Sequence, residues 1–93
     1  MNIDKELNNK GFCKNEQSDT WYYQYSDFEI LSFKVCEHAK VNGEKVLKFS
    51  NLKIIDYINR DIHMSINYDV YFNTFNDFYE FLRLINYQLY SNS

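Results

Sequence analysis

One dipeptide, Asn42-Gly43, constrains the fold of this chain more than any other part of its sequence. Asn-Gly readily supplies the two consecutive residues with positive φ that a two-residue type I′ β-hairpin needs. The dipeptide therefore predicts a hairpin that joins a strand ending near Val41 to a strand running from about Glu44 to Phe49. A chain with such a hairpin at its centre is expected to contain an antiparallel sheet.

Strand periodicity continues on both sides of this hairpin. Over 20–26, aromatic side chains alternate with Tyr22 and Gln24, and this alternation predicts a strand after a polar loop at 13–19. The alternation over 28–35 changes phase after Ile30, which predicts a β-bulge or bend near that residue. The segment 51–59 fits either a helical face or a strand, and we favour the strand.

The most regular alternation in the chain spans 61–72. The pattern predicts one long strand with two distinct faces. Its apolar face is expected to carry Ile62, Met64, Ile66, Tyr68, Val70 and Phe72, and its polar face His63, Ser65, Asn67, Asp69 and Tyr71.

Two helices are predicted at the ends of the chain. A short helix is expected from about Asn2 to Lys10, with Asn2 as its N-cap and Gly11 as the left-handed residue after its end, so that Phe12 contacts Leu7. The second helix begins after Thr74, which is expected to cap it together with Asp77. Its apolar stripe, which predicts a long helix, consists of Phe78, Leu82, Ile85 and Leu89.

These elements predict a single α+β domain over 1–93. It should consist of a short N-terminal helix, an antiparallel sheet of four to five strands, and a long C-terminal helix packed on one face of the sheet. With 93 residues there is room for one core, and an aromatic fraction of 19% helps so short a chain to bury enough apolar surface.

The chain lacks the signals of secretion and membrane insertion. There is no run of about 18 apolar residues, and the N-terminus lacks the basic and then apolar order of a secretory signal. We therefore expect a location in the cytoplasm of a bacterial host cell. In that reducing compartment Cys13 and Cys36 are expected to be thiols.

The sequence offers no recognisable catalytic or metal site. His38 and His63 lie in different predicted strands, and we expect His63 to be an ordinary solvated side chain. Cys36 and His38 lack the spacing of a zinc motif, and no glycine-rich phosphate loop or nucleophile elbow is present. We predict a protein that is not an enzyme and that uses no metal, cofactor or small-molecule substrate.

Charge is distributed unevenly along the chain, which has a net charge of −3. Segments 15–33 and 54–93 are acidic, whereas 34–53 is rich in lysine. The acidic body indicates a partner with a basic groove, and nine tyrosines are more than a small core needs, so some are expected at an interface. The residues expected to bind a partner protein are Tyr22, Asp27, Glu29, Asp69 and Tyr71.

In size, acidity, lack of catalytic motifs and AT-rich residue usage, the whole chain resembles the small proteins that phages encode to block bacterial defence, anti-CRISPR inhibitors among them. The resemblance implies a non-catalytic inhibitor that docks on a CRISPR-Cas effector or its ribonucleoprotein and blocks guide or target nucleic-acid engagement. It implies no particular binding residue, because it rests on no motif.

Two other functions stay open. One is a nucleic-acid-binding module that uses the lysine-rich hairpin 34–53, with Lys40, Lys45, Lys48 and Lys53 meeting phosphates. The other is a structural protein that associates with itself as a homodimer through strand edges or the terminal helix.

Overall fold

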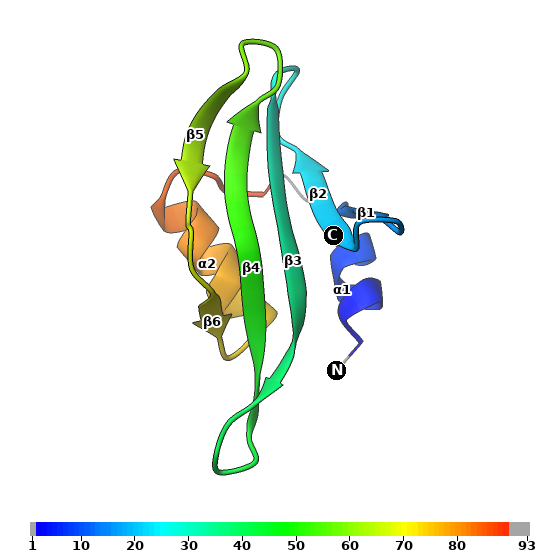
Figure 1. Ribbon diagram of the computed structural model, residues 1–93, viewed down its shortest axis with the longest axis vertical. Helices are drawn as coiled ribbons and strands as arrows, with labels where there is room; N and C mark the ends of the chain where they lie inside the picture. The colour runs from blue at the N-terminus through cyan, green and yellow to red at the C-terminus, as the bar shows by residue number, and fades with distance from the viewer. Residues whose placement is uncertain (1, 90–93) are drawn as a thin grey trace.

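A computed structural model describes residues 2–89 (Figure 1). It contains two helices and six strands, most of them short. In chain order these elements are α1 (Ile3–Asn9), β1 (Cys13–Asn15), β2 (Thr20–Gln24), β3 (Glu29–Ala39), β4 (Lys45–Asp56), β5 (Asp61–Ser65), β6 (Val70–Phe72) and α2 (Phe75–Leu84).

All six strands belong to one antiparallel sheet. Neighbouring strands follow the chain in the order β1-β2-β3-β4-β5, and β6 pairs with β4 beyond the end of β5. The prediction of four to five strands is therefore wrong. The predicted loop at 13–19 contributes β1, and the predicted single strand at 61–72 is divided into β5 and β6.

The first helix forms as predicted. Asn2 caps it, because its side-chain oxygen accepts a hydrogen bond from the backbone N–H of Lys5 at 3.0 Å. Gly11 follows the end with φ of 93°, and the N–H of Phe12 donates to the carbonyl of Leu7 at 2.9 Å. Phe12 and Leu7 are both buried, so the residues at the end of the helix also pack into the core.

The expected long C-terminal helix is wrong. Thr74 caps α2 as predicted, accepting from the N–H of Asp77 at 3.1 Å, but the helix ends at Leu84. Asn86 takes a left-handed φ of 68°, and the N–H of Tyr87 donates to the carbonyl of Leu82 at 2.7 Å. This is a Schellman stop with asparagine in place of glycine, and it overrides the apolar spacing that continues to residue 89.

The central hairpin is present, although its turn differs from the predicted type I′ turn. Gly43 has φ of 87°, whereas Asn42 is not among the residues with positive φ. The N–H of Gly43 donates to the carbonyl of Lys40 at 2.9 Å, and the N–H of Lys40 donates to the carbonyl of Glu44 at 2.7 Å. This pattern is a three-residue loop whose last residue is left-handed, so a single glycine suffices.

The predicted bulge near Ile30 is also misplaced. β3 continues through Ile30 without interruption, and Ile30 and Leu31 point to opposite faces as strand geometry requires. The irregularity lies in β4, where Asn51 has φ of 56° and two residues stand opposite Phe33. Much of 51–59 is strand, as we favoured, since β4 continues to Asp56.

The core lies between the sheet and the two helices, and it is dominated by aromatic rings. Phe49 of β4 stacks on Phe78 of α2 with ring centroids 4.2 Å apart, and Phe33 of β3 contacts both rings. Fully buried aliphatic side chains complete the cluster: Leu7, Leu31, Leu47, Leu52, Ile54 and Leu82.

Both helices contribute side chains to the same core on one face of the sheet. In the view of Figure 1, α2 lies behind and to the left of β4, and α1 lies to the right of β3. Within residues 2–89, no helix covers the opposite face. We call this opposite side the uncovered face. It carries the side chains that alternate with the core residues along each strand, and it is the part of the molecule most available to a partner.

Candidate binding surface

Three isoleucines, two of them half-buried and the third exposed, form a row across the uncovered face. Ile30 of β3 stands opposite Ile55 of β4, which stands opposite Ile62 of β5. The side chain at position 62 is 66% exposed. We call these residues the apolar row. Because β-branched side chains on adjacent strands pack against one another, the row presents one continuous apolar ridge.

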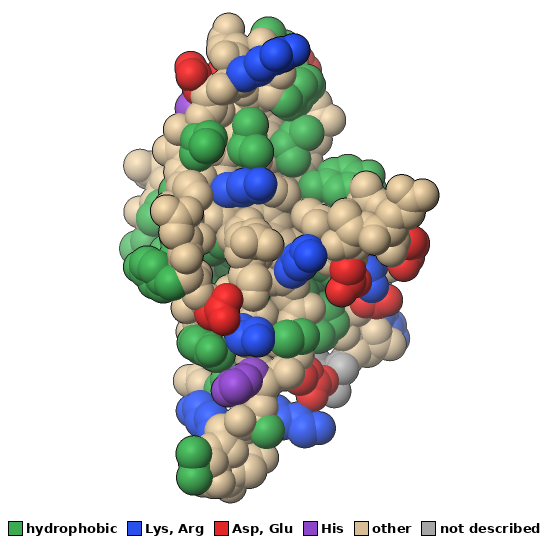
Figure 2. All heavy atoms as spheres, viewed as in Figure 1, with side chains coloured by type: hydrophobic (Ala, Val, Ile, Leu, Met, Phe, Trp, Pro, Cys, Tyr) green, Lys and Arg blue, Asp and Glu red, His purple; other side chains and the backbone are tan. Residues whose placement is uncertain are grey.

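A line of three lysines continues from this row along the two central strands. Lys53 lies two residues from Ile55 on β4, and Lys34 and Lys48 follow toward the hairpin turn. Figure 2 looks onto this face and shows basic and apolar side chains gathered over β3 and β4. No acidic residue within 2–89 lies within 4.0 Å of the ammonium group of any of these three lysines.

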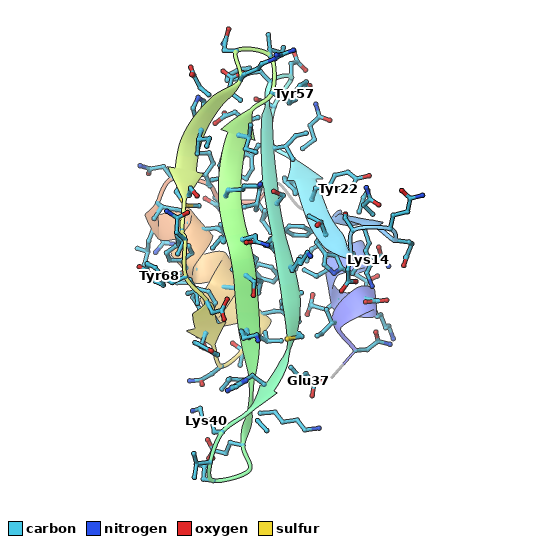
Figure 3. The ribbon with its side chains drawn as sticks, in the orientation of Figure 1. Lys14, Tyr22, Glu37, Lys40, Tyr57 and Tyr68 are labelled. Carbon is cyan, nitrogen blue, oxygen red and sulfur yellow. The ribbon has the colours of Figure 1, made fainter. Side chains whose placement is uncertain are left out.

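The two tyrosines predicted to bind a partner both lie on the uncovered face. Tyr22 belongs to β2 and stands opposite Ser32 of β3, whereas Tyr71 belongs to β6 and stands opposite Lys48 of β4. They are 39% and 49% exposed, and Figure 3 shows Tyr22 beside the central strands. The lysine line therefore runs between two half-exposed aromatic rings.

The three predicted acidic residues do not share one surface. Asp69 accepts a hydrogen bond from Ser50 at 3.0 Å and reaches the uncovered face from its β6 side. Asp27 is exposed in the turn between β2 and β3, where its backbone carbonyl accepts from the hydroxyl of Tyr57. Glu29 lies on the helix-covered side, and its carboxylate accepts from Tyr87 at 3.1 Å.

The four lysines of the alternative function also divide into two groups. Lys48 and Lys53 belong to the lysine line. Lys40 and Lys45 lie at the far end of the central hairpin, where they form ion pairs with Glu44 at 3.8 Å and Glu37 at 3.5 Å (Figure 3). Lys34, which was not among the predicted residues, completes the line.

His63 is exposed to solvent, as we expected, but it also contacts two carboxylates that the sequence did not pair with it. Its Nδ1 lies 2.9 Å from Oε2 of Glu29, and its Nε2 lies 3.7 Å from Oδ2 of Asp56. Asp56 is only 3% exposed and stands directly opposite Glu29 on the neighbouring strand. The register shift between β4 and β5 turns His63 from the predicted polar face toward this carboxylate pair.

The charges of this cluster are mutually stabilising. The hydrogen bond with Glu29 is the main factor that raises the pKa of His63 above its ordinary value. Hydrogen bonds from the backbone and side chain of Asn59 lower the pKa of Asp56. Burial and the bond to Glu29 raise the pKa of Tyr87. The cluster is an internal network that ties β3, β4 and β5 to the segment after α2.

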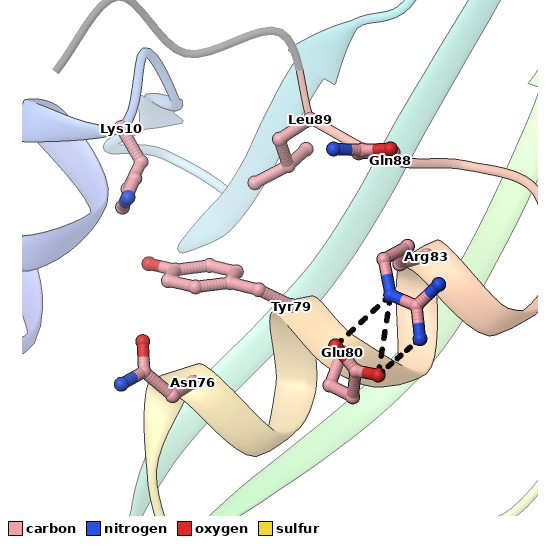
Figure 4. Close-up of a pocket in the computed structure, with 7 residues that line it drawn as sticks. All are labelled: Lys10, Asn76, Tyr79, Glu80, Arg83, Gln88 and Leu89. Carbon is pink, nitrogen blue, oxygen red and sulfur yellow. Dashed lines mark hydrogen bonds and ion pairs between the residues drawn. The ribbon is translucent and has the colours of Figure 1, made fainter.

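A groove of about 340 Å³ opens on the helical side of the molecule (Figure 4). Lys10 lies over the ring of Tyr79 at 5.2 Å, and Glu80 and Arg83 on its floor are already bonded to each other. None of the described lining residues is a histidine, cysteine or serine. Its charged side chains are thus already engaged with one another or with the ring of Tyr79.

Both cysteines are free thiols, as predicted, and both are also exposed. Across residues 2–89, no cluster of three or more histidine, cysteine or acidic side chains has the arrangement of a metal site. Neither helix of the described chain is long and apolar enough to cross a membrane. No protein-family model, curated protein or solved structure matches the chain.

The sequence pointed to two tyrosines that lie partly exposed on the uncovered face, but not to the apolar row or to Lys34. Ile30 and Ile55 were missed because each occurs in a segment where apolar residues fall on both faces. Ile62 was predicted on the same apolar face as Met64, and this prediction is wrong, because the register shift between β4 and β5 places Ile62 opposite Ile55 on the uncovered face. The signal in retrospect is the pair Ile54-Ile55, since two consecutive apolar residues in one strand must point to opposite faces.

Proposed function

We propose that this protein is a non-catalytic binding protein that docks a partner protein on the uncovered face of its sheet. The observation that carries the proposal is the apolar row, in which Ile62 is two-thirds exposed. The lysine line, which has no ion pair with another residue of 2–89, and the partly exposed rings of Tyr22 and Tyr71 lie further along the same face. Exposed apolar side chains ringed by polar and aromatic ones are typical of protein–protein interfaces. We place the protein in the cytoplasm of a bacterial host cell.

The resemblance to small anti-defence proteins supports a more specific proposal, in which the partner is a CRISPR-Cas nuclease effector. The uncovered face carries lysines where the sequence indicated acids, so we propose contact with an acidic part of the effector surface. An inhibitor docked there blocks guide or target nucleic-acid engagement, because it occupies space beside the nucleic-acid groove of the effector. Cleavage assays with a purified effector, with and without the protein, test this step.

The docking surface itself is tested with three immobilised forms of the protein in lysate of an AT-rich bacterium. Ile62→Asp places a charge in the apolar row, whereas Leu84→Asp places the same charge on α2 at a side chain of equal exposure, 66% against 67%. We expect the wild type and Leu84→Asp to retain the same partner after a moderate salt wash, and Ile62→Asp to lose it. Equal recovery by all three forms would contradict the proposal.

The lysine line supports a second candidate function, binding of single-stranded nucleic acid. Lysines flanked by Tyr22 and Tyr71 combine phosphate contacts with rings on which bases stack. This function requires an affinity for RNA or DNA that falls steeply as salt concentration rises. We rank it second because the apolar row offers aliphatic side chains, which do not stack on bases, and because the net charge is −3.

A further inference from the structure

We infer that the occupant of the uncovered face is a protein segment with an apolar end followed by carboxylates, oriented along β3 and β4. The inference rests on the proposed function and adds the chemistry and direction of the partner. Three features of the face carry it: the position of the apolar row, the spacing of the lysines from that row, and the lack of ion-pair partners for these lysines among residues 2–89.

The apolar end of the partner segment binds at the apolar row. Ile30, Ile55 and Ile62 lie at the end of the sheet that also holds the exposed side chains of Phe28 and Ile58. Burying such a ridge under leucine-like or aromatic side chains removes apolar surface from both molecules. Exposed residues of this kind become binding hot spots when a partner excludes water from them.

The acidic end of the partner segment binds along the lysine line. Two residues along a strand span about 7 Å, which is the separation expected between the rows of Ile55 and Lys53. Lys34 and Lys48 extend the positive charge further in the same direction, away from the apolar row. A partner segment therefore meets apolar contact first and ammonium groups afterwards, and carboxylates at its second half complement them.

A second copy of this chain fits the face less well. A two-fold contact brings the same surface to both sides of the interface. The lysine line would then meet a face whose central strands present lysines and isoleucines, and it would gain few carboxylates. Charge complementarity thus favours a different protein over self-association.

The experiment uses two synthetic peptides labelled with fluorescein. One carries leucines in its first half and glutamates in its second half, and the other carries lysines in place of the glutamates. Binding is measured by fluorescence anisotropy with the full chain and its variants, and the contact is mapped by chemical-shift changes in the ¹⁵N-labelled protein. Single-stranded oligothymidylate serves as the nucleic-acid probe.

We expect the leucine–glutamate peptide to bind and to shift the amides of Ile55, Ile62 and Lys53. Ile62→Asp should weaken this binding by about tenfold, the effect of losing one anchor, while Leu84→Asp leaves it unchanged. Lys53→Glu should weaken binding of the leucine–glutamate peptide and reduce its preference over the leucine–lysine peptide, because Lys34 and Lys48 remain on the line. Circular dichroism of each variant confirms that it is folded.

Four results would overturn the inference: no binding of either peptide, equal binding of both, stronger binding of oligothymidylate, or self-association that Ile62→Asp abolishes. If any of these occurs while partner recovery from lysate still depends on Ile62, the proposed function stands and only the chemistry assigned to the partner fails. If recovery is also independent of Ile62, both fail.

Discussion

At the scale of single residues, two carboxylates face each other across neighbouring strands. Glu29 and Asp56 are direct partners in the β3–β4 register, and like charges in this position destabilise a sheet. His63 lies between them and contacts both carboxylates. The imidazolium form therefore reduces a repulsion that the strand register imposes. Hydrogen bonds from the backbone and side chain of Asn59 are the main reason why the Asp56 carboxylate is tolerated at a position with 3% exposure.

This arrangement predicts that stability depends on the charge of His63. Because folding raises its pKa above the ordinary value of 6.5, the folded state binds the proton more tightly than the unfolded state. The stabilisation is fully present below pH 6.5 and is lost as pH rises through the raised pKa. Thermal unfolding measured from mildly acidic to mildly alkaline pH should show this decline, and His63→Gln should remove it.

The control for this pH dependence is His38→Gln. His38 packs on the ring of Tyr71 on the uncovered face, with ring centroids 5.2 Å apart, far from the Glu29–Asp56 pair. The variant should keep the decline in stability that the wild type shows. A wild-type protein whose stability is constant through this pH range would contradict the role assigned to His63.

The sequence alone did not predict this cluster. Glu29 and His63 are 34 positions apart, and period-two alternation places His63 on the solvated side of its strand. A one-residue irregularity in the β4–β5 pairing reverses that orientation, and alternation carries no information about such irregularities. Exposure of Tyr22 and Tyr71 was predictable, because each is flanked by residues that point toward the core.

At the scale of elements, the ends of both helices are determined by one left-handed residue each. The sequence predicted the helix stop at Gly11, because glycine is the usual residue at that position. It did not predict the stop at Asn86, because Ile85 and Leu89 continue the apolar spacing of the helix. The number of strands was underestimated for a similar reason. β1 has only three residues and no apolar alternation, so only its pairing with β2 makes it a strand.

The stop at Asn86 leads to a prediction about two variants. Asn86→Ala should lower the free energy of unfolding by about 1 kcal/mol, because an ordinary side chain adopts left-handed φ at that cost. Asn86→Gly should preserve or increase stability. Urea unfolding measures both changes. Higher helix content in Asn86→Ala by circular dichroism, without loss of stability, would instead favour a helix that continues to residue 89.

Packing of α2 against the sheet leads to a second prediction at this scale. Phe78 is fully buried and stacks on Phe49, so Phe78→Ala should cost about 3–5 kcal/mol. That loss is a large part of the total stability of a small domain. Leu84→Ala, on the exposed side of the same helix, should change stability by less than about 0.5 kcal/mol. Similar losses in both variants would contradict this packing.

At the scale of the whole molecule, stability is distributed unevenly along its 44 Å length. Leu31 pairs with Tyr23 on one side and with Ile54 on the other, in the part of the sheet that both helices cover. The far half of the β3–β4 hairpin extends beyond the helices and ends in an exposed turn (Figure 1). The molecule thus consists of a packed body and a two-stranded arm.

Hydrogen exchange should separate these two parts. Amides of Leu31 and Ile54 are expected to exchange only through global unfolding, whereas those of Ala39 and Lys45 should exchange through local opening of the arm, several orders of magnitude faster. Residue-resolved exchange by NMR measures the difference. Uniform protection along β3 and β4 would show that the arm is as stable as the body.

The outer margins of the sheet have a consequence for behaviour at high concentration. One margin consists of β1, with three residues, and of β3 beyond Phe33, where β2 no longer pairs with it. The other is interrupted between β5 and β6, with five and three residues. Long, continuous margins let further chains add strand after strand into fibrils, and short or broken ones do not. The short strands therefore oppose polymerisation around the body of the sheet, and the open side of β3 in the arm is the margin where a further strand can add.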